Sequence, residues 1–328
     1  MLGAPRGTIA VVSGEAPRPG PGEVLVRLEA CGICYSDLFV AGLEKLPLVP
    51  LTLGHEGIGR VVETGPGVDG YAAGDRVGIT FLAGTCGECD LCRSGRERYC
   101  ARQINFGYTA HGALATYAAV CAQYLAPIPD SLPAAEAAPL CCAGWTAHAA
   151  VGEAGLGPGQ AIGIFGMGCL GHLAVQYALL RGLRVAAVDT AEEKLEQARA
   201  LGAELAVPSE TAGRTLQKQM GGVDAAVVLT GAPAAIQQAF RAVKRTGTVV
   251  VVGLSSNQYE LPIVDTVLKG IGVRGSYLGT RAGLEEVLRL GASGQVRPRV
   301  ETFAIEEAPR LMEQLSHGQL MGRAVVVF

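Results

Sequence analysis

Charge is scarce in this chain of 328 residues, and neither sign of charge dominates. Charged residues make up 17% of the sequence and hydrophobic residues 49%, with a formal net charge of −3. Because there is no basic excess, the composition argues against nucleic acid or an anionic membrane surface as a partner. The abundant apolar residues can bury a large core, and the length favours two domains.

Long apolar runs, internal repeats and low-complexity tracts are also missing. The longest apolar stretches, such as 248–254, are far shorter than a membrane-spanning helix requires. The first residues contain no long apolar segment before a small-residue cleavage site, so we expect no signal peptide and a cytoplasmic protein.

Cysteine and glycine, in contrast, are plentiful, with 10 and 46 copies. In a reducing compartment, clustered cysteines indicate a metal site rather than disulfides. Cys86, Cys89, Cys92 and Cys100 have the spacing C-x2-C-x2-C-x7-C. Four thiolates can surround a zinc ion and leave no position for water, so the loop 86–100 predicts a structural zinc site. An iron–sulfur cluster also uses four cysteines and stays open on spacing alone.

The pattern of apolar residues changes near residue 144. Before this point, alternation of polar and apolar residues predicts half-buried strands at 23–29, 57–63 and 75–79. After it, short apolar runs alternate with helical segments, which indicates βαβ units and a parallel sheet. The last residues, 324–328, form a strand-like run that is expected to return to the first domain.

The second region has the six strands that a complete dinucleotide-binding fold requires. The expected strands are 161–165, 184–188, 205–207, 225–229, 248–252 and 272–274, and the expected helices are 170–180, 191–201 and 233–243.

Gly166, Gly168 and Gly171 form a GxGxxG motif that directly follows an expected strand and opens a helix. In that context Gly166 is expected to allow a tight turn, and Gly168 to let a pyrophosphate approach the backbone. Gly171 is expected to let the helix pack closely on the strand. Asp189 ends the second strand of this region. In a dinucleotide-binding fold, an acidic residue at this place binds the adenosine ribose and would repel a 2′-phosphate, so Asp189 favours NAD over NADP. Lys194 lies within reach of the same ribose. The alternative is that Asp189 only caps the following helix.

Several motifs occur together in one order along the chain. They are Cys-Tyr-Ser-Asp at 34–37, Gly-His-Glu-Gly-Ile-Gly at 54–59, the four-cysteine loop, Leu-Cys-Cys-Ala-Gly at 140–144 and the GxGxxG motif. This combination resembles the zinc-containing alcohol dehydrogenases of the medium-chain dehydrogenase/reductase superfamily, over essentially the whole chain. The resemblance implies an α/β fold with a Rossmann dinucleotide-binding domain at 144–275. It also implies a β-rich, GroES-like catalytic zinc domain at 1–143 and 276–328.

The resemblance further implies a catalytic zinc held by Cys34, His55 and Cys142, with water or substrate in the fourth position. Glu56 corresponds to a residue that lies behind this zinc and can sometimes bind it. Asp37 corresponds to a carboxylate that orients the histidine, although it could also be a simple helix cap.

Four further residues receive roles from the same resemblance. Ser36 would take the proton of the alcohol and pass it to the nicotinamide ribose. Thr146 would lie beside the nicotinamide and Leu170 behind its ring, although Leu170 could equally be an ordinary helix core residue. Arg323 would contact the pyrophosphate.

The expected function is reversible hydride transfer between NAD and small primary or secondary alcohols, aldehydes or ketones, with two zinc ions per chain. Apolar residues such as Phe81, Leu82 and Trp145 favour aliphatic or aromatic alcohols over sugars. A polyol-type zinc dehydrogenase and a non-catalytic protein that binds zinc and nucleotide are the alternatives. We expect a homo-oligomer, a tetramer rather than a dimer, with no nucleic-acid or membrane partner.

Overall fold

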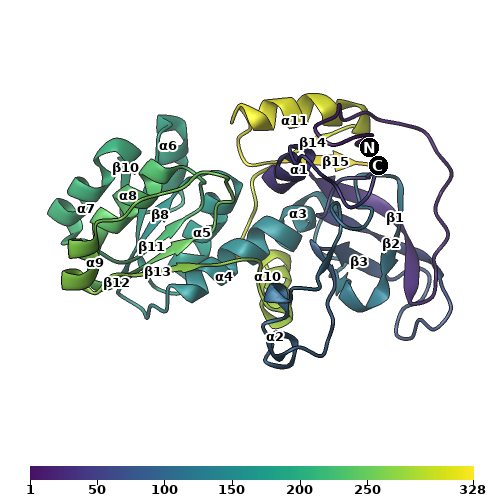
Figure 1. The fold of residues 1–328 in the computed structure, drawn as a ribbon, viewed down its shortest axis with the longest axis horizontal. Coiled ribbons are helices and arrows are strands. Elements are labelled where there is room, and N and C mark those ends of the chain that lie inside the picture. The colour runs from purple at the N-terminus through teal and green to yellow at the C-terminus, as the bar shows by residue number, and fades with distance from the viewer. The chain divides into compact units, whose positions relative to one another are not determined.

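The computed structural model describes residues 1–328, which form two compact units. The first unit contains Met1–Cys142 and Thr280–Phe328, and the second contains Ala143–Gly279. Figure 1 shows the chain as a ribbon and labels the helices and strands for which there is room.

The first unit is built on a seven-stranded sheet with the order β14-β15-β1-β2-β3-β7, in which β6 also pairs with β1. Strand β1 is central: it pairs antiparallel with β2, β6 and β15. The expected return of the C-terminal strand to the first domain is thereby confirmed, because β15 pairs with β1. The strands are β1 (Glu23–Gly32), β2 (Gly57–Thr64), β3 (Arg76–Ile79), β6 (Tyr117–Cys121), β7 (Ala126–Pro127), β14 (Val300–Phe303) and β15 (Arg323–Val327).

Shorter elements complete the first unit, and several of them carry the cysteines. Strands β4 (Leu82–Gly84) and β5 (Ile104–Asn105) form a separate two-stranded sheet beside the four-cysteine loop. The π-helix η3 (Leu140–Gly144) carries Cys142 at the end of the unit's first segment. The remaining helices are α1 (Tyr35–Ala41), α2 (Asp90–Arg93), η1 (Glu97–Tyr99), η2 (Ala122–Tyr124), α3 (Ala134–Pro139), α10 (Arg281–Ala292), η5 (Ile305–Glu307) and α11 (Ala308–Ser316).

The second unit contains a six-stranded sheet with the order β10-β9-β8-β11-β12-β13, and every neighbouring pair is parallel. Counted within the unit, this order is 3-2-1-4-5-6, which is the doubly wound order of dinucleotide-binding folds. The strands are β8 (Ala161–Phe165), β9 (Arg184–Asp189), β10 (Leu205–Pro208), β11 (Val223–Val228), β12 (Val243–Val251) and β13 (Gly272–Gly275).

The central strands of this sheet are buried on both faces, which explains why they read as continuous apolar runs. All six expected strands are present, with β11 beginning two residues earlier and β12 five residues earlier than expected. The three expected helices are α5, α6 and α8. The helices of the unit are α4 (Trp145–Glu153), α5 (Cys169–Leu180), α6 (Glu192–Ala200), η4 (Ser209–Thr211), α7 (Ala212–Met220), α8 (Pro233–Ala242) and α9 (Ile263–Lys269).

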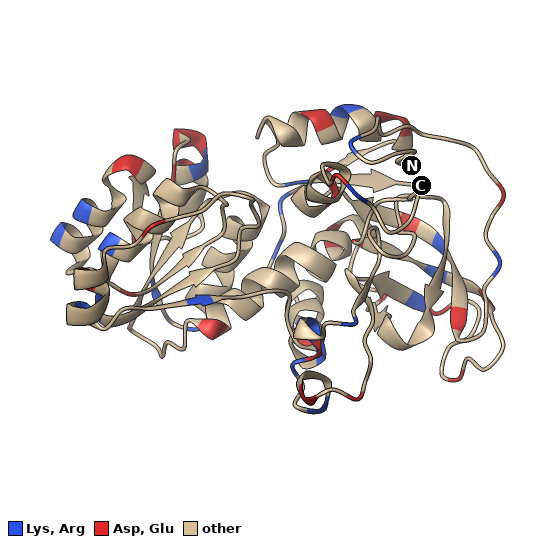
Figure 2. Cartoon of the chain, viewed as in Figure 1, with Lys and Arg blue, Asp and Glu red and all other residues tan.

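Acidic and basic residues are interspersed in each unit and are not gathered by sign (Figure 2). This mixed distribution agrees with the small net charge of −3. None of the helices combines the length and the apolar character that crossing a bilayer requires.

Candidate metal centres and dinucleotide site

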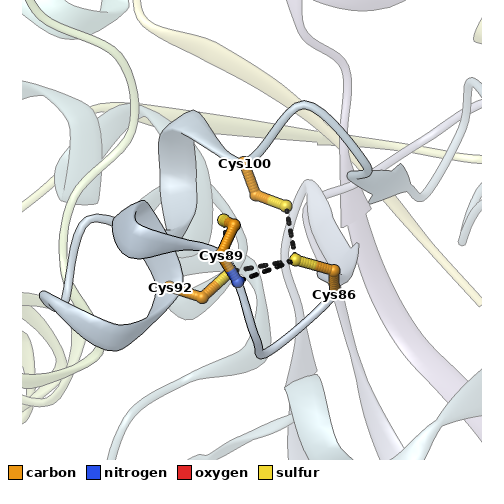
Figure 3. A group of neighbouring side chains, drawn as sticks. All are labelled: Cys86, Cys89, Cys92 and Cys100. Carbon is orange, nitrogen blue, oxygen red and sulfur yellow. Dashed lines mark hydrogen bonds between the residues drawn. The ribbon is translucent and has the colours of Figure 1, made fainter.

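The four cysteines of the loop converge on one point (Figure 3). The sulfur of Cys86 lies 3.5 Å from that of Cys100 and 3.8 Å from that of Cys92, and Cys89 and Cys92 are 3.5 Å apart. All four thiols are free. A tetrahedral zinc site with Zn–S bonds of about 2.3 Å requires sulfur–sulfur separations of roughly 3.8 Å, so this arrangement fits the metal.

Local hydrogen bonds favour the ionised form of two of these thiols. The backbone N–H groups of Glu88 and Cys89 point at the Cys86 sulfur and lower the pKa of that thiol to about 6. The hydroxyl of Thr85 lies 3.5 Å from the Cys92 sulfur and lowers the pKa of that thiol. Since a metal binds thiolates, the loop is prepared for a cation by its own backbone and neighbours.

A second cluster of metal-binding side chains lies in the interior of the first unit. The ligand atoms of Cys34, His55, Glu56 and Cys142 all lie within 4.8 Å of one another, and all four residues are buried. Cys34 precedes helix α1, and His55 and Glu56 precede strand β2. Because Cys142 lies in the π-helix η3, the cluster joins three distant segments of the chain.

Gly54 places the histidine. Its φ of 96° lies in the left-handed region, and a Cβ there would lie 2.6 Å from the backbone nitrogen of Leu114. A side chain at this position would therefore be strained and would collide with a neighbouring loop. The backbone can turn His55 into the cluster only because residue 54 is glycine.

Asp37 holds the cluster together from behind. One carboxylate oxygen accepts a hydrogen bond from the backbone N–H of Cys34 at 2.9 Å. The other lies 3.1 Å from both the N–H of Gly54 and Nδ1 of His55. A helix cap alone does not account for all the contacts of Asp37, because the same carboxylate also binds Nδ1 of His55 and orients the ring.

The opposite ring nitrogen of His55 has the features of a metal ligand. Nε2 is buried and has no hydrogen-bond partner, although buried polar atoms are normally paired. The ring also packs edge-on against Phe81, with centroids 5.1 Å apart. A nitrogen whose other side is fixed by a carboxylate is the usual arrangement of a histidine that binds metal.

The charges in this cluster also call for a cation. Hydrogen bonding with Cys142 lowers the pKa of Cys34 well below its usual value, and the same bond raises the pKa of Cys142. Burial lowers the pKa of His55, but Asp37 and Cys34 outweigh burial and raise it well above its usual value. The shifts favour Cys34 as a thiolate and keep protons on Cys142 and His55, and a divalent cation bound by the cluster would replace those protons.

Glu56 and Arg323 form a buried ion pair beside these donors. Burial raises the pKa of Glu56 to about 7, against the opposing effect of Arg323. Nη2 of Arg323 lies 2.9 Å from the carboxylate, and Nη1 donates to the carbonyl oxygen of Ile33 at 2.9 Å. Arg323 is only 3% exposed, so these contacts favour an interior role, and its contact with a pyrophosphate stays a prediction.

Ser36 lies next to the cluster, in the first turn of α1. Its Oγ is 3.7 Å from the sulfur of Cys34, and the residue is half-buried. A hydroxyl in this place is near enough to contact a small molecule that a metal ion in this cluster would bind.

In the second unit, the turn after β8 has the features expected of each glycine. Gly166 has a φ of 98°, the space around a Cβ of Gly168 is open, and a Cβ on Gly171 would collide with the carbonyl oxygen of Gly166. Helix α5 begins at Cys169, directly after Gly168. The turn can therefore admit a phosphate close to the backbone at a helix N-terminus.

Asp189, at the end of β9, is engaged with its own backbone surroundings. One oxygen accepts from the N–H groups of Thr190 and Ala191 at 2.8 and 3.0 Å, and the other accepts from Met167 at 2.6 Å. It thus stabilises the start of α6 and also ties β9 to the glycine turn. Since each carboxylate oxygen can accept two hydrogen bonds, the oxygen facing Met167 keeps capacity for one ribose hydroxyl.

Three other predicted cofactor residues also lie in the second unit. Thr146 is buried in α4, Leu170 is half-buried in α5, and Lys194 is half-buried in α6. No contact of these side chains distinguishes a cofactor role from a packing role, so their roles stay predictions.

The sequence patterns did not single out the residues around the four-cysteine loop. Thr85 directly precedes a ligand, and its hydroxyl was a signal that could have been used. Tyr124, whose hydroxyl lies 2.8 Å from that of Thr85, is 39 residues away and gives no such signal.

Comparison with known families agrees with this arrangement. Residues 20–130 match the alcohol dehydrogenase GroES-like domain, and residues 169–293 match the zinc-binding dehydrogenase domain. An alcohol dehydrogenase of Geobacillus stearothermophilus is 45% identical over 319 residues, covering 95% of this chain and 93% of the relative. The chain belongs to the zinc-containing alcohol dehydrogenases of the medium-chain dehydrogenase/reductase superfamily.

Solved structures of alcohol dehydrogenases have the same fold. That of Aeropyrum pernix superposes with a TM-score of 0.90 at 31% identity, covering 97% of this chain and 96% of that one. Acetophenone reductase of Geotrichum candidum, solved in complex with NAD, superposes with a TM-score of 0.87 at 33% identity. The match covers 95% of this chain and 92% of that one. This zinc alcohol dehydrogenase is therefore an NAD-dependent oxidoreductase with a GroES-like and a Rossmann-type domain, as its sequence predicted. The finding favours alcohol dehydrogenation over the polyol-type and non-catalytic alternatives.

Proposed function

We propose that alcohols are oxidised, and aldehydes or ketones reduced, at a zinc ion held by Cys34, His55 and Cys142. The observation that carries this assignment is the buried Nε2 of His55, which has no partner and lies among two thiols and a carboxylate. A zinc ion bound there would act as a Lewis acid that makes the hydroxyl of a bound alcohol more acidic near neutral pH.

The chain's own residues would then perform three tasks. Asp37 keeps the His55 ring oriented, because its carboxylate already binds Nδ1. Ser36 would accept the proton of the alcohol hydroxyl and pass it on toward the nicotinamide ribose, and a bound NAD would supply the acceptor of the hydride. Glu56 stays paired with Arg323 and serves as a reserve ligand, since its carboxylate lies within the same cluster.

We propose a second, structural zinc ion at Cys86, Cys89, Cys92 and Cys100, which gives two per chain. Sulfur–sulfur distances of 3.5 to 3.8 Å support it. Elemental analysis should find two zinc ions per chain. Mild chelation should remove about half of the metal and almost all of the activity, because only one site has an open position. Full activity without zinc would contradict both assignments.

We propose small aliphatic or aromatic alcohols as substrates. Phe81 packs against His55 and gives the metal cluster an apolar neighbour. Polyol-type relatives resemble this chain but tend to have an acidic or water-mediated arrangement where Cys142 stands. Comparing hydride transfer with ethanol, benzyl alcohol and sorbitol tests the assignment: ethanol or benzyl alcohol should be preferred to sorbitol, and a preference for sorbitol would overturn it.

We propose that the enzyme prefers NAD over NADP, because Asp189 ends β9 and its carboxylate would repel a 2′-phosphate. Gly166, Gly168 and Gly171 would receive the pyrophosphate, with Arg323, Lys194, Thr146 and Leu170 in the supporting roles given above. The ratio of kcat/KM for the two cofactors is the measurement, and a ratio in favour of NADP would refute this role of Asp189.

The remaining expectations concern the organisation of the protein. We propose that residues 1–143 and 276–328 form the catalytic zinc domain, and that 144–275 form the NAD-binding domain. We further propose a cytoplasmic homo-oligomer, a tetramer rather than a dimer, by resemblance to bacterial relatives of this length. Light scattering coupled to size-exclusion chromatography would measure the assembly, and a monomer would exclude it.

A further inference from the structure

Two hydroxyl groups lie in a row behind the four-cysteine loop. Oγ1 of Thr85 is 3.5 Å from the sulfur of Cys92 and 2.8 Å from the hydroxyl oxygen of Tyr124. Thr85 directly precedes the first cysteine of the loop, whereas Tyr124 closes the turn η2 after strand β6. Both side chains are half-buried.

The chemistry of the three groups fixes the direction of the hydrogen bonds. A thiolate that binds metal has no proton and can only accept. Thr85 must therefore donate its single hydroxyl proton to Cys92. Its oxygen is then free to accept, so Tyr124 donates to Thr85. Hydrogen bonds in such a chain polarise and strengthen one another.

Arg281, the first residue of helix α10, holds Tyr124 in position. Its guanidinium carbon lies 4.5 Å from the centroid of the Tyr124 ring, which is cation–π distance. The same group donates to the carbonyl oxygen of Gln123 at 3.0 Å and to the carboxylate of Glu97 at 2.9 Å. Because Glu97 lies between Cys92 and Cys100, Arg281 connects the turn that carries Tyr124 to the loop that carries the thiols.

We propose that Tyr124 and Thr85 form a hydroxyl relay that donates to the Cys92 thiolate and thereby slows the loss of zinc from the four-cysteine loop. Both are positioning residues, because they act through Cys92. The inference rests on the proposed structural zinc. A hydrogen bond to a ligating sulfur matters because groups behind a ligand orient it and tune its donor strength.

The rate of zinc release tests the relay. The whole enzyme, loaded with zinc, is mixed with a chromophoric chelator, and the slow phase of release is followed. Thr85→Val removes the donor at nearly constant volume and should speed this phase about tenfold, since loss of such a group typically costs metal affinity 10- to 100-fold. Tyr124→Phe should speed it less, because Thr85 can still donate. Thr85→Ser keeps the hydroxyl and should restore the original rate.

The double variant Thr85→Val with Tyr124→Phe separates a relay from independent packing effects. In a relay, Tyr124 has no route to Cys92 without Thr85, so the double variant should release zinc no faster than Thr85→Val alone. Additive effects would overturn the relay. Tyr71→Phe is the matched control, because the Tyr71 hydroxyl donates to the carbonyl oxygen of Leu125 at 3.3 Å and not to Thr85 or to a sulfur. It should leave the rate unchanged.

Cobalt substitution gives a spectroscopic readout. A hydrogen bond lowers the energy of sulfur electrons, so its loss in Thr85→Val should move a thiolate-to-cobalt charge-transfer band to lower energy. Thr85→Ser should show no shift. An unshifted band in Thr85→Val, together with unchanged zinc release, would overturn the relay while leaving the zinc site intact. If the unsubstituted protein and Cys100→Ser contain the same amount of zinc, the four-cysteine loop holds no zinc ion. The proposed structural site then fails, and the relay fails with it.

Discussion

The two thiol-rich clusters of this enzyme lie in the same unit but are built at different levels of structure. The four-cysteine loop takes all its ligands from residues 86–100, and three of those cysteines are half-buried. The other cluster draws Cys34, His55 and Cys142 from three distant segments, and all of them are buried.

This difference indicates what each cluster can do. A loop that supplies four sulfurs by itself leaves no position for a substrate, so a metal ion bound there could only hold the loop in shape. A cluster assembled from distant segments can leave one side open, because its ligands come from separate walls. Each cluster also has a hydroxyl near a sulfur: Ser36 lies 3.7 Å from Cys34, and Thr85 lies 3.5 Å from Cys92. We expect the first to move a proton and the second only to donate a hydrogen bond.

The largest contrast should come from replacing one ligand of the buried cluster. Cys142→Ser should lower turnover by at least about 10³-fold, because a metal acting as a Lewis acid contributes several kcal/mol. The rate of NADH formation with benzyl alcohol is the measurement. Cys141→Ser makes the same change at the neighbouring residue, which lies outside the cluster, and should keep most of the turnover. Equal losses in both variants would remove Cys142 from the ligand set.

The next contrast concerns the two hydroxyls. Ser36→Ala should lower turnover about 10²- to 10⁴-fold, the usual contribution of general acid–base catalysis, while leaving zinc content and NAD affinity unchanged. Ser36→Thr keeps a hydroxyl and should recover part of the rate. Thr85→Val should show the reverse pattern, with faster zinc release and normal turnover. An equal loss of NAD affinity in Ser36→Ala would assign Ser36 a structural role.

A smaller effect is expected behind the histidine. Asp37→Asn keeps the side-chain shape but weakens the acceptor of three hydrogen bonds, to Cys34, Gly54 and His55. Zinc affinity of the buried cluster should fall about 10- to 100-fold, with no change in the slow release from the four-cysteine loop. Competition with a chelator of known affinity measures both. Weakening of both clusters together would show that they are not independent.

The smallest effect on catalysis should come from the four-cysteine loop. Cys100→Ser should remove one zinc ion per chain and lower the melting temperature by roughly 10 °C, because metal binding contributes several kcal/mol to folding. Turnover of the remaining folded enzyme should change little. Cys121→Ser, at a half-buried cysteine outside both clusters, is the control. A collapse of turnover without loss of stability would make this loop catalytic.

Much of the fold could be predicted because its signals are local. The six strands of the second unit appear as apolar runs, since a parallel sheet is buried on both faces. Short helices were harder to predict: α1, with seven residues, is too short to be stable alone and is fixed by the hydrogen bond that the backbone N–H of Cys34 donates to the Asp37 carboxylate. Strand β12 begins five residues before its apolar run because Val243 already pairs with Val223, and an irregularity in the register separates this pair from the pair of Ala225 and Thr248.

The sequence by itself determined the four-cysteine loop and the glycine turn, because their spacing lies within one short segment of chain. It also determined the family, through motifs that occur in one order. Only the tertiary structure decided that Cys34, His55 and Cys142 share one buried point, that Asp37 holds the histidine, and that Arg323 pairs with Glu56 in the interior. The structure likewise placed Tyr124 behind Thr85. The physical reason is that these contacts join residues far apart in sequence, and only strand pairing and burial bring such residues within hydrogen-bonding distance.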